Sequence, residues 1–264
     1  MCIDKKSINK DIAADCCGEI PSLHFESLLM HDKLSHSIFT RKGGVSKPPY
    51  DSLNVSYNTG DLHDNVNENI RLIKDKIGAG HILSMNQVHG TDIVVLHKEN
   101  DCNPAIQTAD AIITNLPLMG IMVKQADCQG AIIYDRIRSV VAVVHCGWRG
   151  NVLDILGSVV NRMGSEFGCE AQDLLAAIGP SLGPCCAEFT AYRDLFPEEF
   201  TEFIVRDNHF DLWEISRMQL SRAGLMKDNI KISGICTKCN TDLFYSYRAE
   251  GNTGRFGTVA MLKE

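Results

Sequence analysis

The sequence predicts a mixed α/β fold of the α+β type, a single domain in which a mixed β-sheet is flanked by helices. Short β-branched runs follow one another closely in the middle of the chain, while strongly amphipathic helical segments are few. Because strands and helices do not alternate regularly, a doubly wound parallel sheet is not expected. The 264 residues contain no long linker and no fixed-period repeat, so we expect a loose N-terminal extension over residues 1–20 and one folded domain over residues 21–264.

Helices are indicated where apolar residues recur on one face. The first covers residues 61–77, with Asp61 or Asp64 as its cap and Gly78 after its end. The second, over residues 152–163, has the clearest helical period in the chain and follows the turn after a predicted strand. A third helix is expected near residues 211–223.

Strands are indicated by short β-branched or apolar runs between Gly, Asn, Asp and Pro residues. Five of them follow the first helix closely and three more lie in the second half of the chain. The expected strands cover residues 92–96, 111–114, 120–124, 131–134, 140–144, 174–178, 230–235 and 258–262.

Composition excludes several classes of protein. The formal net charge is −7, which argues against a dedicated nucleic-acid binder, because neutralising phosphates requires a basic surface. The longest apolar runs fall far short of the roughly 20 residues of a membrane helix, and the N-terminus has no apolar signal region. We therefore expect a cytoplasmic protein whose 11 cysteines stay reduced, as core residues, metal ligands or nucleophiles.

Three residues of metal-ligand type share a context at the ends of predicted strands. His89 precedes one strand, Cys128 lies in the turn between two others, and His145 closes the most apolar strand. If these ends meet on one rim of a sheet, two imidazoles and a thiolate would suit Zn²⁺ with a fourth position for water. The alternative is two ordinary polar histidines and a core cysteine, because no short chelate spacing fixes the geometry.

Two glycine-rich segments carry arginines. In the turn Cys146–Gly150, Arg149 and the start of the following helix favour an anion such as phosphate, although a plain strand-to-helix turn explains the same pattern. Residues 244–257 place two arginines among aromatic side chains, which can bind an anion and stack a planar base. A glycine-rich hairpin with surface arginines is the alternative.

Four further cysteines form a separate group of candidates. Cys236 and Cys239 make a C-x-x-C motif after a predicted strand, and Cys185 and Cys186 are adjacent in the sequence. The motif is open to a redox role or, with the adjacent pair, a four-cysteine zinc site. No thioredoxin-type helix follows the motif, and adjacent cysteines chelate one ion awkwardly, so neither role is favoured.

Several motifs, in order along residues 35–262, resemble those of the laccase-domain family, once named polyphenol oxidases and now regarded as purine nucleoside phosphorylases. They are Thr40-Arg-Lys-Gly-Gly-Val-Ser46, Ser52-Leu-Asn-Val-Ser56 with Thr59-Gly-Asp61, Gln87-Val-His-Gly90, Ala109-Asp-Ala111, Ala126-Asp-Cys128, His145-Cys-Gly-Trp-Arg-Gly150, Ile178-Gly-Pro-Ser181, and Ser246-Tyr-Arg248 with Thr253-Gly-Arg255.

The resemblance implies one Zn²⁺ per chain on His89, Cys128 and His145, with Cu²⁺ a less favoured occupant. It further implies phosphorolysis of adenosine, inosine, guanosine or methylthioadenosine, and deamination of adenosine, with purine nucleosides and phosphate as partners. Asp127 is a candidate proton carrier, or a support for its turn. The candidate substrate and phosphate contacts are Arg41, Asn54, Arg149 and Arg248.

Two other functions remain as alternatives. A copper-dependent polyphenol oxidase is disfavoured, because copper centres of that type need many histidines, and the nine here are scattered without a His-x-His pair. A metal-stabilised binding module without enzymatic activity would explain the ligands but not the arginines gathered near them.

Overall fold

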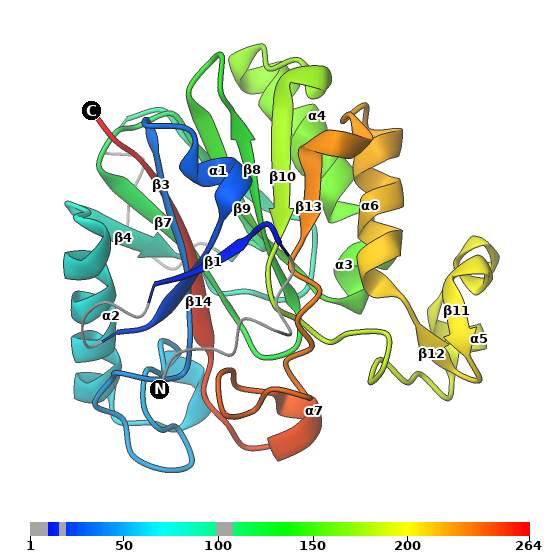
Figure 1. Ribbon diagram of the computed structural model, residues 1–264, viewed down its shortest axis with the longest axis horizontal. Helices are drawn as coiled ribbons and strands as arrows, with labels where there is room; N and C mark the ends of the chain where they lie inside the picture. The colour runs from blue at the N-terminus through cyan, green and yellow to red at the C-terminus, as the bar shows by residue number, and fades with distance from the viewer. Residues whose placement is uncertain (1–9, 16–19, 99–107) are drawn as a thin grey trace.

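Two six-stranded sheets pack face to face in the computed structural model, with helices on the outer face of each (Figure 1). The structure describes residues 10–15, 20–98 and 108–264. The four layers are therefore helix, sheet, sheet and helix. No helix within these ranges is long and apolar enough to span a membrane.

The first sheet is antiparallel except at one edge. Its strands run in the order β1 (Ile12–Asp15), β2 (Ser22–Phe25), β3 (Leu34–Phe39), β14 (Phe256–Leu262), β7 (Met119–Gln125) and β4 (His81–Ser84). β4 pairs with β7 in parallel. Helix α2 (His63–Ile77) covers the outer face through Ile73, and the short α1 (Glu26–Leu29) follows β2.

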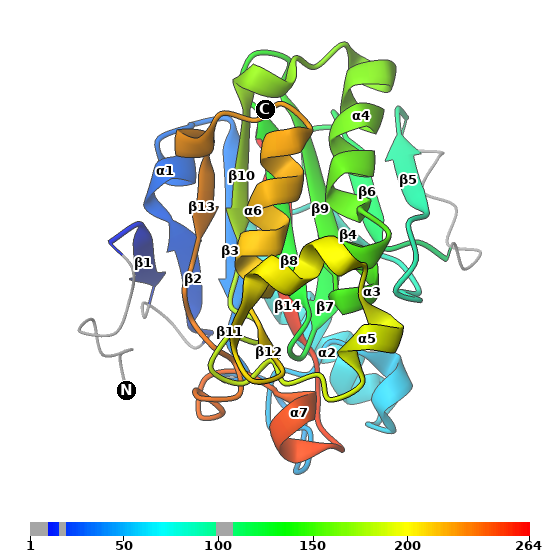
Figure 2. The ribbon, with the colours of Figure 1, turned by 90° about the vertical axis from the view of Figure 1, so that its right-hand side faces the viewer.

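The second sheet is also mixed. Its order is β13 (Ile230–Ile232), β10 (Leu174–Ile178), β8 (Gln129–Asp135), β9 (Val140–Cys146), β6 (Ala111–Thr114) and β5 (Ile93–Leu96), with a parallel pair at each edge. Helices α4 (Ile155–Phe167) and α6 (Leu212–Arg222) lie across its outer face (Figure 2). Because this sheet is covered on both faces, β8 and β9 are buried along their whole length, which explains their nearly continuous apolar sequences.

A small aromatic unit extends from the second sheet. It contains α5 (Tyr192–Leu195), the hairpin of β11 (Ile204–Arg206) and β12 (His209–Phe210), and a 3₁₀ segment (Glu198–Phe203). Phe189, Phe196 and Phe210 form its centre. The remaining short elements are α3 (Trp148–Val152), α7 (Tyr247–Glu250) and the 3₁₀ turns Tyr57–Thr59, Ala171–Asp173 and Lys227–Asn229.

The mixed α/β class is confirmed, with differences in detail. The single predicted sheet is two sheets, because β4, β7 and β14 pair with the N-terminal strands while β5, β6, β8, β9, β10 and β13 pair with one another. The helix expected over residues 152–163 is divided: α3 ends at Val152, and Asp154 caps α4 by accepting from the Gly157 amide. Ile12–Asp15 forms a strand paired with β2, so it is not loose as expected, and the rest of residues 1–20, apart from 10–11 and 20, lies outside the described residues.

Candidate active site and metal centre

His89, Cys128 and His145 converge at the junction of the two sheets. Their ligand atoms lie within 4.8 Å of one another. Cys128 lies where β7 of the first sheet leads into β8 of the second, His145 is on β9, and His89 belongs to the segment between β4 and β5. The sequence correctly groups these residues, but they do not come from one rim of a single sheet.

Asp110 holds both histidines in place. Its carboxylate contacts His145 Nδ1 at 2.8 Å and accepts from the amides of His89 and Gly90 at 3.0 and 2.7 Å. Asp110 is fully buried, yet these partners outweigh the effect of burial and lower its pKa. With Nδ1 occupied, His145 is left with Nε2 as its ligand atom, an orientation that carboxylate partners commonly impose on metal-binding histidines.

The three donors also shift one another's protonation. Burial alone would raise the pKa of Cys128, but the neighbouring His145 and His89 lower it to about 6. Burial likewise opposes the charged form of His145, but the Cys128 thiolate and the Asp110 carboxylate raise its pKa to about 9. At neutral pH the Cys128 thiolate is therefore favoured together with the His145 imidazolium, whose proton a metal ion must displace when it binds.

The backbone leaves room for an ion beside these donors. A Cβ at Gly147 would lie 2.8 Å from Cys128 Sγ and 3.3 Å from His89 Cδ2, so a side chain here would push into the ligand set. His89 itself adopts a left-handed backbone with φ of 63°. Two imidazoles and one thiolate match the donors of a catalytic transition-metal site with an open position, so the residues fit such an ion.

A cavity of about 610 Å³ opens beside the three donors. This volume lies within the range of small-molecule sites. Four cationic side chains line it, together with three aromatic side chains and several amides. The cations are Lys124, Arg149, Arg248 and Arg255, and the aromatic residues are Trp148, Phe189 and Tyr247.

Of the arginines predicted as substrate contacts, Arg149 and Arg248 line this cavity. Arg149 stacks on Trp148 with its guanidinium carbon 4.5 Å from the ring centre. Arg248 lies 5.4 Å from the Phe189 ring centre and donates to the Glu188 carbonyl at 2.8 Å. Both therefore line the cavity with their cations held against its aromatic wall.

Asp127 lines the cavity but its carboxylate is already engaged. Oδ1 accepts from the hydroxyls of Thr237 and Ser246, each at 2.7 Å, and Oδ2 accepts from the Arg248 amide at 2.6 Å. Three donors on one carboxylate anchor the β7–β8 turn to the C-terminal loops. This arrangement matches the support role considered for Asp127 and places it next to Cys128.

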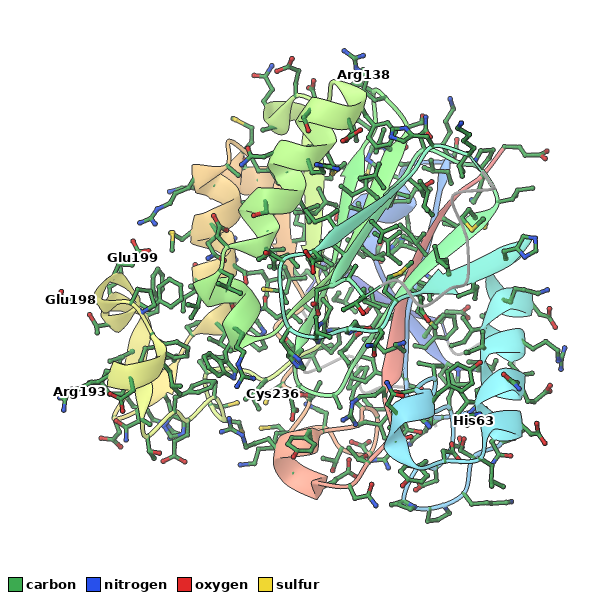
Figure 3. All side chains as sticks on the ribbon, turned by 180° about the vertical axis from the view of Figure 1, so that it is seen from behind. His63, Arg138, Arg193, Glu198, Glu199 and Cys236 are labelled. Carbon is green, nitrogen blue, oxygen red and sulfur yellow. The ribbon has the colours of Figure 1, made fainter. Side chains whose placement is uncertain are left out.

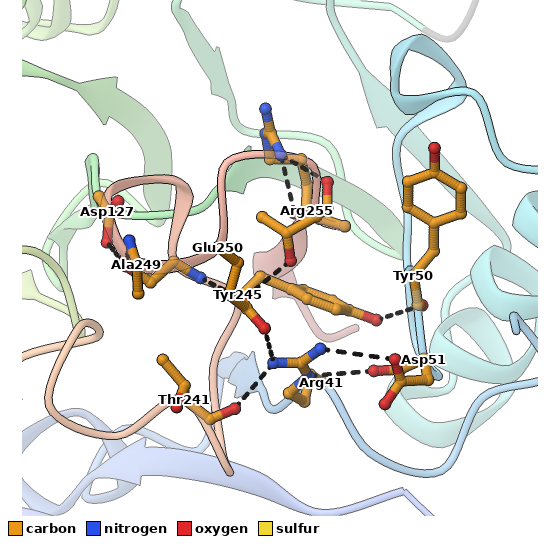
Figure 4. Close-up of polar contacts among 12 residues, drawn as sticks. Arg41, Tyr50, Asp51, Asp127, Thr241, Tyr245, Ala249, Glu250 and Arg255 are labelled. Carbon is orange, nitrogen blue, oxygen red and sulfur yellow. Dashed lines mark hydrogen bonds and ion pairs between the residues drawn. The ribbon is translucent and has the colours of Figure 1, made fainter. Parts of the chain in front are cut away.

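Arg41 and Asn54 lie outside this cavity. Arg41 donates to Glu250 at 2.7 Å and to the carbonyls of Thr241 and Asp51, and it lies over the Tyr245 ring (Figure 4). Asn54 is fully buried and bonds to Asp61 and to the Arg255 amide. Both side chains hold loops in place, and the structure does not bring these two predicted substrate contacts to the cavity.

Two residues of the site, Asp110 and Lys124, were not singled out from the sequence, whereas Arg255 is one of the two arginines noted in residues 244–257. Asp110 lies within a family-like motif, which offered a signal for it. Lys124 lies in a predicted strand, and the sequence gives no sign that it differs from an ordinary exposed lysine. In the structure its ammonium donates to the Met85 carbonyl at 2.9 Å. Burial lowers the pKa of Lys124 to about 8.

Comparison with known proteins places this site in a family. A model described as multi-copper polyphenol oxidoreductase laccase matches residues 35–263. The chain belongs to this laccase-domain family. YfiH of Shigella flexneri, named a purine nucleoside phosphorylase, is 34% identical over 234 residues, which cover 84% of this chain and 91% of that protein.

Other relatives match this chain over nearly its full length. A purine nucleoside phosphorylase of Bacteroides thetaiotaomicron is 29% identical over 260 residues, covering 91% of this chain and 96% of that protein. The crystal structure of YlmD from Geobacillus stearothermophilus superposes with a TM-score of 0.87 at 26% identity, covering 97% and 100% of the two chains. Family members thus share the fold, and relatives of this chain carry the names of enzymes.

Proposed function

We propose that this chain is a purine nucleoside phosphorylase that acts on adenosine, inosine, guanosine and methylthioadenosine, and that it also deaminates adenosine. In phosphorolysis the bond between ribose C1′ and the purine nitrogen breaks. A bond from C1′ to a phosphate oxygen forms, and the purine leaves with the electron pair and takes up a proton. In deamination water replaces the amino group at purine C6 and ammonia leaves.

One observation carries the proposal: four cations surround one cavity in a protein of net charge −7. Of the described residues that line it, Asp127 is the one carboxylate, and its oxygens already accept three hydrogen bonds. The excess positive charge suits a phosphate dianion, which guanidinium groups bind with charge-assisted hydrogen bonds. Such fixed charges also stabilise charge that develops on phosphate and on the departing purine.

The remaining walls suit a nucleoside. Trp148, Phe189 and Tyr247 offer flat apolar surface for a purine, and Asn86 offers an amide side chain. The amide of Gln87 is engaged by the backbone of Lys124 through reciprocal bonds of 2.7 and 2.8 Å, so Gln87 fixes this wall of the cavity. A cavity with apolar walls and a few oriented polar groups is typical of small-molecule binding.

We assign the three-donor centre to Zn²⁺ on the chemistry of its ligands. His89, Cys128 and His145 would hold the ion, and Asp110 would keep His145 oriented toward it. When bound, zinc lowers the pKa of a coordinated water to near 7, which supplies hydroxide for deamination. Within this proposal Asp127 is a positioning residue, because its three hydrogen bonds fix the turn that carries Cys128.

The test is phosphate-dependent release of free purine from inosine and adenosine. We expect release by the wild type that rises with phosphate concentration, and inosine formation from adenosine without phosphate. Cys128→Ser should lower the rate of deamination by more than about 100-fold. Loss of a hydrogen-bond partner of a metal ligand typically costs about 10–100-fold, and loss of the ligand itself should cost more. Cys169 is buried and belongs neither to the three-donor centre nor to the group of four further cysteines. Cys169→Ser is therefore the matched control and should retain both activities.

Two results would overturn parts of this proposal. If no purine is released at any phosphate concentration, the chain is not a phosphorylase. If Cys128→Ser deaminates adenosine at the wild-type rate, the three-donor centre takes no part in deamination. Oxidation of a phenol by the copper-loaded protein, at a turnover equal to that of the nucleosides, would favour the oxidase alternative.

A further inference from the structure

A second group of ligands lies apart from the three-donor centre. The Sγ atoms of Cys185, Cys186, Cys236 and Cys239 all lie within 4.8 Å of one another. Cys239 Sγ is 3.7 Å from Cys185 Sγ and 3.5 Å from Cys186 Sγ. Figure 3 labels Cys236 beside the loops that precede α7. The chain thus brings an adjacent cysteine pair and a C-x-x-C motif, about 50 residues apart in sequence, to one point.

We propose that these four cysteines bind a second metal ion, a tetrahedral Zn²⁺ with no open coordination position. A Zn–S distance of about 2.3 Å places the sulfurs of a regular tetrahedron about 3.8 Å apart. The two sulfur–sulfur distances at Cys239 are close to this value without any rearrangement. A cluster of several iron atoms would need its sulfurs further apart, so a single ion fits better.

The local backbone removes the difficulty posed by adjacent cysteines. Cys185 and Cys186 lie in a turn in which the amides of Cys186 and Ala187 both donate to the Gly183 carbonyl at 2.9 Å. In this turn both sulfurs face Cys239. The Gly183 amide in turn donates to Cys236 Sγ at 3.3 Å, a contact that stabilises a thiolate.

Backbone pairing aligns the two loops independently of the sulfurs. Ser181 and Cys236 form a parallel β-bridge, and the Thr237 amide donates to the Ser181 carbonyl at 3.0 Å. The ligand set is therefore prearranged, which lowers the entropic cost of binding an ion. Positive groups are also nearby: Lys238 lies within the C-x-x-C motif, and Arg206 donates to the Cys185 carbonyl at 2.8 Å. They offset the negative charge of four thiolates on one divalent ion.

The four-cysteine centre lies beside the cavity, where a bound ion would have a structural role. One of its loops continues to Phe189 and the other carries Thr237, the partner of Asp127. An ion on all four cysteines would lock these two walls of the cavity together. The inference concerns metal binding and holds whether or not the chain acts on nucleosides.

Metal content of the reduced, full-length protein tests the proposal. We expect about two zinc ions per chain in the wild type and in Cys169→Ser, and about one in either Cys128→Ser or Cys239→Ser. The double variant Cys128→Ser/Cys239→Ser should bind none. Zinc content in Cys239→Ser equal to that of the wild type would overturn the proposal.

Cobalt substitution provides a second readout that does not require Cys239→Ser to fold. Co²⁺ bound in place of zinc should show strong thiolate-to-metal charge-transfer absorption in Cys128→Ser, whose four-cysteine group is intact. Absence of that absorption together with absence of zinc in Cys128→Ser would refute the second centre. So would a disulfide between Cys239 and Cys185 or Cys186 in protein purified under reducing conditions, detected by peptide mass.

Discussion

The two groups of metal-type ligands in this chain differ in donors, surroundings and support. His89, Cys128 and His145 offer two nitrogens and one sulfur beside a cavity lined by cations. The four-cysteine group offers four sulfurs from two loops and leaves no ligand position open. The first arrangement suits reactivity at a free position, whereas the second suits a structural crosslink.

The difference in support matters as much as the difference in donors. His145 is part of β9 and is held by the buried Asp110, so the first group keeps its shape through the sheets and their core. Cys185, Cys186 and Cys239 lie in loops outside the strands. Backbone pairing at Ser181 and Cys236 aligns these loops, but Cys185, Cys186 and Cys239 lie beyond that pairing, so an ion is expected to add more to the fold at the second group than at the first.

The largest expected effect is a difference in thermal stability between variants of the two ligand groups. Cys239→Ser should lower the free energy of unfolding by about 3 kcal/mol or more, or roughly 6–12 °C in Tm, because it removes the ion that joins two loops. Cys128→Ser should lower Tm by a much smaller amount while lowering deamination strongly. Thermal unfolding followed by circular dichroism, with activity measured on the same samples, compares the two variants. Equal losses of Tm would show that the groups do not differ in structural role.

Asp110→Asn probes the support of the first group alone. The amide keeps the size of the carboxylate but loses the charge that stabilises and orients His145, and losing such a partner typically costs 10–100-fold in metal affinity or activity. We expect a loss in that range in zinc affinity, measured by competition with a chelator. The zinc that resists chelation in Cys128→Ser should be unchanged by adding Asp110→Asn. Loss of that second ion would mean that the two groups are not independent.

The sequence predicts the elements better than their arrangement. Strands such as β8 and β9 carry a local apolar pattern, so their positions agree with expectation to within a few residues. The division into two sheets depends on pairing between distant segments, such as β14 with both β3 and β7, which local patterns do not encode. The apolar residues Val152, Ile155 and Leu156 keep helical spacing across the interruption between α3 and α4, so the apolar pattern does not reveal the break at Leu153 and Asp154.

The candidate site shows the same limit. His89, Cys128 and His145 could be grouped because ligand-type residues at strand ends are conspicuous even without contacts. The position of an arginine depends instead on the tertiary fold: Arg41 pairs with Glu250 outside the cavity, whereas Arg255 lines the cavity while donating to neighbouring carbonyls. Lys124 gains its place from burial beside Met85, which no sequence pattern reports.

The smallest expected effect is a pH dependence confined to the cavity of the first group. Since burial lowers the pKa of Lys124 to about 8, its charge is present at pH 7 and largely lost at pH 9. If the charged form binds phosphate, KM for phosphate should rise up to about tenfold over this interval, in inverse proportion to the fraction of Lys124 that stays protonated. Lys124→Arg keeps its charge throughout, so its KM should stay flatter, and the ionisation of phosphate itself cancels in the comparison. Identical KM profiles for wild type and Lys124→Arg would exclude Lys124 from phosphate binding. The same pH change should leave the zinc content of Cys128→Ser unaltered, because Lys124 lines the cavity and is not one of the four cysteine ligands.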